Sequence, residues 1–110
     1  MNEALRKKYI PMTETTYYTL LAVTTPRHGY AIMQFVDEKT RGRLALGAGT
    51  LYGALTSLEK KGWIAPFGGT EGRKKEFKIT PQGKAAAETE LLRLKDLTQI
   101  AETIMGGTQA

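Results

Sequence analysis

The sequence predicts an α+β fold that is mainly α-helical and contains one small β-hairpin. Apolar residues recur at helical spacing along most of the 110 residues, for example at Leu51, Leu55 and Leu58. Residues 75–79 instead alternate between polar and apolar side chains, as a half-buried strand does, and a glycine-rich stretch precedes them. These patterns place a hairpin between the third helix of the chain and the last one.

The first half of the chain is expected to hold two helices. Residues 1–11 form a basic N-terminal arm that ends at a proline, and Thr13 is suited to cap a first, largely buried helix. A proline and a glycine within residues 25–29 predict a turn. A second helix follows over residues 30–39, and residues 44–46 are expected to form a very short strand.

The second half is expected to hold a third helix, the hairpin and a long last helix. The third helix begins near Ala48 and ends at Gly62, because glycine is favoured just past a helix end. Two strands are expected at residues 63–67 and 75–79. The last helix covers residues 81–105 and starts after a threonine suited to cap it, with proline at its first position.

Helix, helix, short strand, helix and hairpin is the element order of a winged helix-turn-helix domain. In such a domain the third helix enters the DNA major groove and the hairpin forms the wing. We therefore divide the chain into a basic N-terminal arm over 1–11, a winged helix-turn-helix domain over 12–80, and a C-terminal dimerisation helix and tail over 81–110.

Short motifs across residues 16–86 resemble the PadR family of bacterial transcriptional regulators, in its short form with a single C-terminal helix. The matching segments are 28–30 (His-Gly-Tyr), 49–52 (Gly-Thr-Leu-Tyr), 58–60 (Leu-Glu-Lys), 62–64 (Gly-Trp-Ile), 72–75 (Gly-Arg-Lys-Lys) and 79–83 (Ile-Thr-Pro-Gln-Gly). Two positions depart from the family pattern, Gly47 where a capping serine is common and Glu76 where an aromatic residue is usual. The resemblance implies a DNA-binding repressor that a small-molecule effector releases.

The charge of the chain agrees with a polyanionic partner. The formal net charge is +5 and the isoelectric point is near 9.6. Residues 56–78 hold six Lys and Arg against three Asp and Glu. The basic surplus therefore surrounds the second half of the third helix and the hairpin, which predicts double-stranded DNA as the partner.

The candidate DNA-binding residues lie on the third helix and on the wing. They are Thr50, Tyr52, Gly53, Thr56, Ser57 and Lys60 on the helix, and Arg73, Lys74 and Lys75 on the wing. The side chains on this helix face are small and polar, so we expect few direct base contacts and a share of the specificity from DNA shape. The alternatives are an ordinary amphipathic helix, a Tyr52 whose ring packs on the first helix, and a wing whose charges are only solvated.

The last helix carries the candidate dimerisation residues, which are Leu91, Leu94, Leu97, Ile100, Ala101 and Ile104. This helix is too long for the core of a single small domain to cover. We expect a second copy to cover it in a two-fold homodimer on a palindromic operator. The alternative is a helix folded back on its own domain. The sequence does not decide whether the basic N-terminal arm contributes to the dimer or to DNA contact.

Other classes of function find little support. The absence of cysteine excludes disulfides and thiolate zinc sites. His28 is the only histidine and Ser57 the only serine, so neither a metal site nor a catalytic residue is expected, and no cofactor. Because no apolar run resembles a signal peptide or a membrane span, we expect a cytoplasmic protein without a membrane partner.

The competing hypothesis is a winged-helix module that binds protein instead of DNA. The sequence does not identify the operator, the regulated gene or the effector. No aromatic residue follows Phe77, so the last helix supplies no ring for stacking. A flat aromatic effector is therefore less favoured than an aliphatic one, a protein partner or none.

Overall fold

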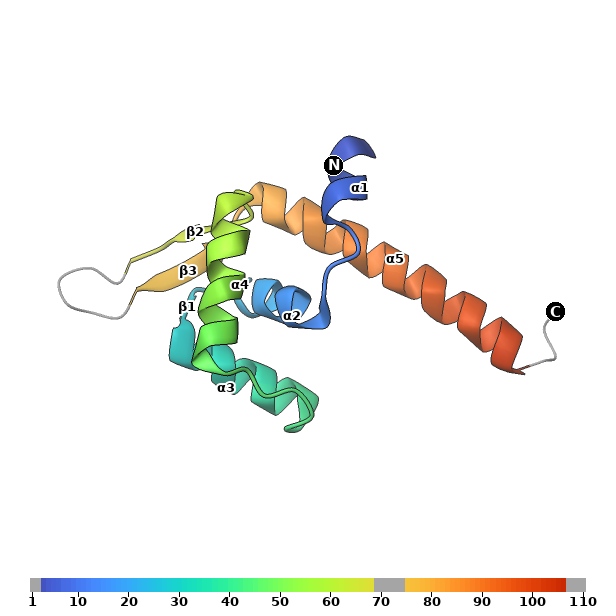
Figure 1. The fold of residues 1–110 in the computed structure, drawn as a ribbon, viewed down its shortest axis with the longest axis horizontal. Coiled ribbons are helices and arrows are strands. Elements are labelled where there is room, and N and C mark those ends of the chain that lie inside the picture. Colours follow the sequence, from blue (N-terminus) through green and yellow to red (C-terminus); the bar gives the residue numbers. More distant parts are fainter. Residues whose placement is uncertain (1–2, 69–74, 107–110) are drawn as a thin grey trace.

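The structure is a computed structural model that describes residues 3–68 and 75–106. Its elements, in chain order, are α1 (Glu3–Tyr9), α2 (Glu14–Ala22), β1 (Arg27–His28), α3 (Gly29–Thr40), α4 (Ala48–Lys60), β2 (Ile64–Pro66), β3 (Glu76–Ile79) and α5 (Pro81–Gly106). Helices α2, α3 and α4 pack together with a small sheet at one side of them, and α5 runs away on the other side (Figure 1). The predicted α+β class with a small hairpin is confirmed.

Local chemistry sets several helix boundaries. Thr13 caps α2, and its Oγ1 accepts a hydrogen bond from the Thr16 amide at 3.1 Å. Thr80 precedes α5 and accepts from the Gly83 amide at 3.0 Å. Gly62 adopts a φ of +77°, a conformation that reverses the chain two residues after α4. These three features were predicted from the sequence.

The sheet has three antiparallel strands in the order β1-β3-β2. Ile64 pairs with Ile79 across the hairpin, and Arg27 pairs with Phe77 on the other edge of β3. The prediction of a strand at residues 44–46 was wrong, because the third strand of the sheet is β1. The backbone just before β1 is also bonded to β3, because the Ile79 amide donates a hydrogen bond to the Val23 carbonyl at 2.8 Å.

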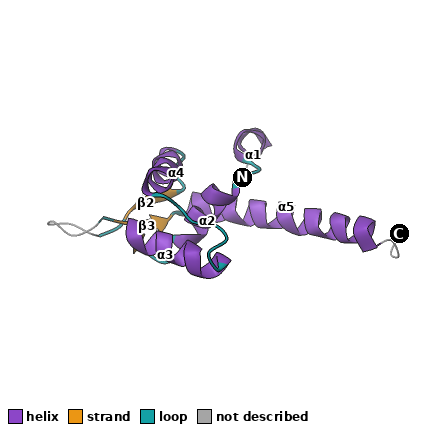
Figure 2. Ribbon diagram, turned by 60° about the horizontal axis from the view of Figure 1, so that its bottom comes forward, coloured by secondary structure: helices purple, strands orange, loops and turns teal. Residues whose placement is uncertain are grey.

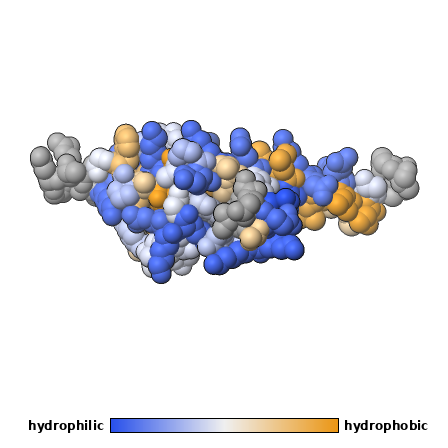
Figure 3. Space-filling model, turned by 90° about the horizontal axis from the view of Figure 1, so that it is seen from above, coloured by the Kyte–Doolittle hydropathy of each residue, from blue (hydrophilic) through white to orange (hydrophobic). Residues whose placement is uncertain are grey.

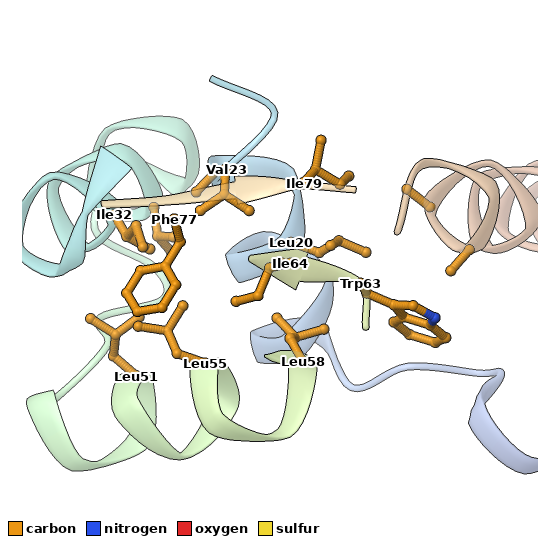
Figure 4. Packing of buried hydrophobic residues seen from close by; sticks show 14 of the residues in the cluster. Leu20, Val23, Ile32, Leu51, Leu55, Leu58, Trp63, Ile64, Phe77 and Ile79 are labelled. Carbon is orange, nitrogen blue, oxygen red and sulfur yellow. The ribbon is translucent and has the colours of Figure 1, made fainter. Parts of the chain in front are cut away.

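One hydrophobic core joins α2, α3, α4 and the sheet. Figure 4 shows its side chains pointing toward one another from these elements. The labelled residues are Leu20, Val23, Ile32, Leu51, Leu55, Leu58, Trp63, Ile64, Phe77 and Ile79, all of them buried. Leu46 also belongs to this core, so the 44–46 segment contributes a buried side chain without forming a strand.

The N-terminal arm forms a helix, which the sequence interpretation did not include. Residues Glu3–Tyr9 make up α1, and the peptide bond between Ile10 and Pro11 is cis. The Tyr9 ring meets the Trp63 ring edge-on, with centroids 5.5 Å apart and planes inclined by 79°. This contact holds α1 against the domain.

Helix α5 first crosses the domain at very short range. A Cβ on Gly83 would lie 2.1 Å from the Trp63 carbonyl oxygen and 2.8 Å from a side-chain carbon of Ile79. Beyond Glu90 the helix continues away from the core, so it does not fold back on its own domain (Figure 1). None of the described helices is both long and apolar enough to cross a membrane.

We expect Gly83→Ala to lower the free energy of unfolding by about 1–3 kcal/mol, because the new methyl group would overlap backbone atoms that cannot move independently. Gly53→Ala is the matched control, since a Cβ there meets nothing within 4 Å. Alanine at this helical position should stabilise by roughly 0.5–1 kcal/mol. Urea denaturation at one protein concentration measures both changes, and equal effects would contradict the close crossing.

Candidate nucleic-acid interface

Helix α4 has one buried face and one exposed face. Its buried residues are Leu51, Ala54, Leu55 and Leu58. The opposite side lies along an outer edge of the molecule (Figure 2). Of the residues predicted to contact DNA, the exposed ones on this helix are Thr50, Tyr52, Gly53, Thr56 and Lys60, and Ser57 is half-buried. The structure therefore brings all six to the surface of one helix.

The hydroxyl of Thr56 is already engaged within the helix. Its Oγ1 donates to the Tyr52 carbonyl at 2.9 Å, so toward a ligand it can act only as an acceptor. The helix surface at Gly53 is open, since a Cβ on this residue would meet nothing within 4 Å. This part of the helix is low in profile, as the sequence predicted.

The start of α4 has no side-chain cap. Gly47 holds the extended N-cap conformation, but no side-chain oxygen occupies the cap position. The residues from Gly47 to Thr50 are exposed. Unpaired amides at a helix start, together with the helix dipole, favour an anion there.

Tyr52 rests on the first residue of α3. A Cβ on Gly29 would lie 2.5 Å from the Tyr52 hydroxyl oxygen, so only glycine leaves the ring its present position. Tyr52 as a residue is still 53% exposed. Next to it, His28 caps α3 by accepting the Ala31 amide on Nδ1 at 3.3 Å. The starts of α3 and α4 therefore meet at Tyr52.

The hairpin projects beyond α4 on the side away from α5 (Figure 1). Lys75 is exposed, and its Nζ lies 5.3 Å from the centre of the Phe77 ring. Phe77 is buried in the core, so this lysine is anchored where the wing leaves the sheet. Arg73 and Lys74, the other two predicted wing residues, lie outside the described residues.

The sequence interpretation missed one buried carboxylate. Glu90 is 1% exposed, and the Arg93 guanidinium donates to it at 2.7 and 3.0 Å. The Met12 amide donates to the same carboxylate at 3.1 Å. Glu90 thus ties α5 to the segment between α1 and α2. The sequence held one signal for this burial. Glu90 lies three residues after Ala87 and four before Leu94, at a position that fits the apolar spacing of the helix.

Glu90 also influences its surroundings electrostatically. Its hydrogen bond with Arg93 raises the pKa of that guanidinium above the usual value. Burial, and then the negative charge of Glu90, raise the pKa of the Tyr17 phenol. The Tyr17 hydroxyl donates to the Ala87 carbonyl at 2.8 Å, so a polar contact also joins α2 itself to α5.

A cavity of about 410 Å³ lies between α2 and α5 beside this contact. Its lining residues are Met12, Glu14, Tyr17, Tyr18, Leu21, Glu90, Arg93 and Leu94. Two aromatic rings therefore reach the cavity from α2. The sequence argument against an aromatic effector considered only the rings of the last helix, so its premise was too narrow.

The second half of α5 presents an uncovered apolar side (Figure 3). Among the predicted dimerisation residues, Leu91, Leu97, Ile100, Ala101 and Ile104 are exposed, and Leu94 is half-buried. Ile104 is 71% exposed, an unusual position for such a large apolar side chain. Within residues 3–68 and 75–106, no group of three or more His, Asp or Glu side chains is placed to hold a metal ion.

Comparisons with known proteins agree with this architecture. The profile of the transcriptional regulator PadR-like family matches residues 18–89. An uncharacterized 37.1 kDa protein in transposon TN4556 of Streptomyces fradiae is 42% identical over 65 residues, or 59% of this chain. The chain spans only 18% of the length of that relative.

Solved structures with the same fold cover most of the chain. A transcriptional regulator from Clostridium thermocellum superposes with a TM-score of 0.65 at 21% identity, over 98% of this chain and 100% of the other. A PadR family transcription regulator from hypervirulent Clostridium difficile gives a TM-score of 0.71 at 19% identity, over 84% and 99%. At these identities the likeness establishes the fold.

We expect Glu90→Gln to lower the free energy of unfolding by about 1–3 kcal/mol, because it removes the charge from buried hydrogen bonds to Arg93 and Met12. Glu88→Gln makes the same chemical change on the exposed side of α5 and should stay within about 0.5 kcal/mol. Thermal denaturation at a fixed protein concentration compares the two. Indistinguishable curves would mean that the Glu90 contacts do not stabilise the fold.

Proposed function

Since the chain belongs to the PadR-like family of transcriptional regulators, we propose that it binds double-stranded DNA sequence-specifically and represses transcription as a homodimer on a palindromic operator. The observation that carries this proposal is the exposed face of α4, which is small and polar and starts beside Tyr52. A helix of this profile fits the DNA major groove. The proposed location is the cytoplasm and the proposed partner is double-stranded DNA. We assign no catalytic role and no cofactor.

The start of α4 is the proposed phosphate-binding site. Its first amides have no side-chain cap, and Thr50 and Tyr52 are exposed residues in the first turns of the helix. Tyr52 is held at Gly29, so its hydroxyl can position both α3 and α4 against one DNA backbone. Phosphate contacts of this kind fix the register of the helix but do not read sequence.

Base reading falls to the short side chains of α4. Gly53, Thr56 and Ser57 offer few donors, and the Thr56 hydroxyl hydrogen is used within the helix. Lys60 lies at the far end of the same face. We therefore assign part of the specificity to the shape and deformability of the operator.

The wing supplies further charge through Lys75, with Arg73 and Lys74 preceding it in the sequence. Lys75 leaves the sheet from a buried aromatic residue, which limits where its ammonium can reach. We assign these three residues to phosphates or to the minor groove next to the α4 site.

A second copy is the proposed cover of α5. Along one side of this helix, Gly83, Ala87 and Glu90 are buried in the domain, and Leu97 and Ile104 continue the same alternation of three and four residues into solvent. This spacing is that of a coiled-coil seam. Pairing through it would present two α4 helices to half-sites about 34 Å apart.

Release by a small molecule is the regulatory part of the proposal. The cavity between α2 and α5 lies where the DNA-binding domain meets the proposed dimer helix, and Glu90 and Arg93 line it. A ligand there would act on the angle between the two parts. Its aromatic and charged lining admits ring-containing molecules as well as aliphatic ones.

The remaining alternative is a winged-helix module that binds protein. A gel shift with mixed genomic fragments separates the two, because a protein-binding module has no salt-sensitive affinity for DNA. The basic residues at the end of α4 and on the wing favour DNA.

We expect Lys75→Gln and Arg73→Ala each to reduce the slope of log affinity against log salt by about 0.9, because each removes one phosphate contact. Fluorescence anisotropy with a labelled duplex measures the slope between about 50 and 200 mM salt. Lys95→Gln, at an exposed position on α5, is the control and should keep the wild-type slope. An unchanged slope in both wing variants would remove the wing from the interface.

We expect Leu97→Asp to convert the proposed dimer to a monomer at micromolar concentration, because it places a charge in the apolar seam. Gln99→Asp introduces the same charge about half a turn away, on the side of α5 opposite the seam, and should leave the dimer intact. Sedimentation velocity or light scattering measures the mass. A monomeric wild-type protein would contradict the dimer directly.

A further inference from the structure

We propose that α1 provides a third contact to the DNA backbone. Lys8 of α1 and Lys61 at the end of α4 lie beside the same Tyr9 ring, and with their chain neighbours Lys7 and Lys60 they make up what we call the α1–α4 basic patch. Its occupant is the phosphate backbone that flanks the groove entered by α4. This inference rests on the proposed function, and it assigns the N-terminal arm to the DNA.

The patch is held together by two aromatic rings. The Nζ of Lys61 lies 4.9 Å from the centre of the Tyr9 ring and 5.1 Å from that of Trp63. The Nζ of Lys8 lies 5.3 Å from the same Tyr9 ring. Because Trp63 is 4% exposed and belongs to the core, Tyr9 fixes α1 to the domain at the point where α4 ends.

The lysines of the patch have no negative partner within the described part of the chain. None of Lys7, Lys8, Lys60 and Lys61 forms an ion pair with another described residue. Glu3 is already paired with Arg6 at 3.6 Å. Lys8 and Lys61 both lie beside the Tyr9 ring, so an anion bound near them would offset two like charges. A polyanion with regularly spaced charges meets this requirement.

The position of α1 suits the same DNA molecule that α4 would bind. Figure 2 shows α1 and α4 along one edge of the molecule, α3 along the opposite edge, and the sheet between α4 and α3. Figure 3 looks onto this end of the domain, where hydrophilic surface predominates and the apolar surface gathers along α5. A duplex lying along the outer face of α4 would therefore pass α1 at the end of that helix.

A place for α1 in the dimer interface is the competing outcome. A second side of α1 faces α5 across a cavity of about 500 Å³, lined by Arg6, Ile10, Thr89, Leu92, Arg93 and Asp96. Lys7 and Lys8 do not line this cavity. A role in the dimer would then involve residues other than the two lysines.

The test compares two double variants of the full chain by fluorescence anisotropy, using a mixed-sequence duplex of about 30 base pairs, roughly three helical turns. Lys7→Gln with Lys8→Gln should reduce the salt slope by up to about 1.8, since each phosphate contact adds about 0.9. Lys84→Gln with Lys95→Gln removes the same charge from exposed positions on α5 and should leave the slope unchanged. Equal slopes in the two double variants would overturn the inference.

A second variant tests the anchor while keeping every charge. Tyr9→Leu removes the ring that Lys8, Lys61 and Trp63 share, and should lower the slope toward that of the Lys7 and Lys8 double variant. A wild-type slope in Tyr9→Leu would overturn the anchoring. A change of the dimer mass in Arg6→Gln, with an unchanged slope in Lys7→Gln with Lys8→Gln, would assign the arm to the dimer and also overturn it, because Arg6 lines the cavity that faces α5.

Failure of this inference is distinguishable from failure of the proposed function. If the wild-type protein binds DNA and Lys75→Gln lowers the slope, the proposed function stands whatever the α1 variants do. If the wild-type protein has no salt-dependent affinity for the duplex, the proposed function and the inference fall together.

Discussion

The arrangement of the other elements depends on the contacts of Trp63. Its amide donates to the Leu58 carbonyl at 3.1 Å, which ends α4, and its carbonyl accepts from Thr80 at 3.0 Å, which begins α5. The same carbonyl leaves no room for a side chain on Gly83, and the indole ring holds Tyr9 of α1. Because α1, α4 and α5 all meet at this one residue, none of the three can shift without disturbing the others.

This junction gives the proposed dimer a rigid connection to the proposed DNA site. One side of α5 is buried in the domain as far as Glu90 and continues into solvent at Leu97. A second copy bound there would set the separation of the two α4 helices through the Trp63 contacts. In the proposed regulation, a ligand in the cavity between α2 and α5 would alter the angle of α5 to the domain without touching DNA. In the proposed complex, the long cationic side chains at the end of α4 supply charge, and the short side chains in its middle allow the helix to approach DNA closely.

The sequence by itself determined the features that depend on neighbours along the chain. The caps at Thr13 and Thr80, the chain reversal at Gly62 and the two faces of α4 all arise from residues within about one helical turn of each other. Period-two alternation likewise predicted the buried and exposed sides of β3. The class, the order of α2, α3, α4 and α5, and the exposure of the α4 candidates could therefore be predicted from the order of the residues alone.

Only the tertiary structure decided the features that need a partner distant in sequence. A two-residue strand exists only by pairing, so the third strand formed at Arg27–His28, beside β3, and not at residues 44–46. Three further contacts also depend on residues distant in sequence. They are the packing of Tyr52 on Gly29, the burial of Glu90 against Met12 and the docking of α1 on Trp63. Each joins segments separated by 20 residues or more, and local pattern carries no information about such contacts because the packed core brings them together.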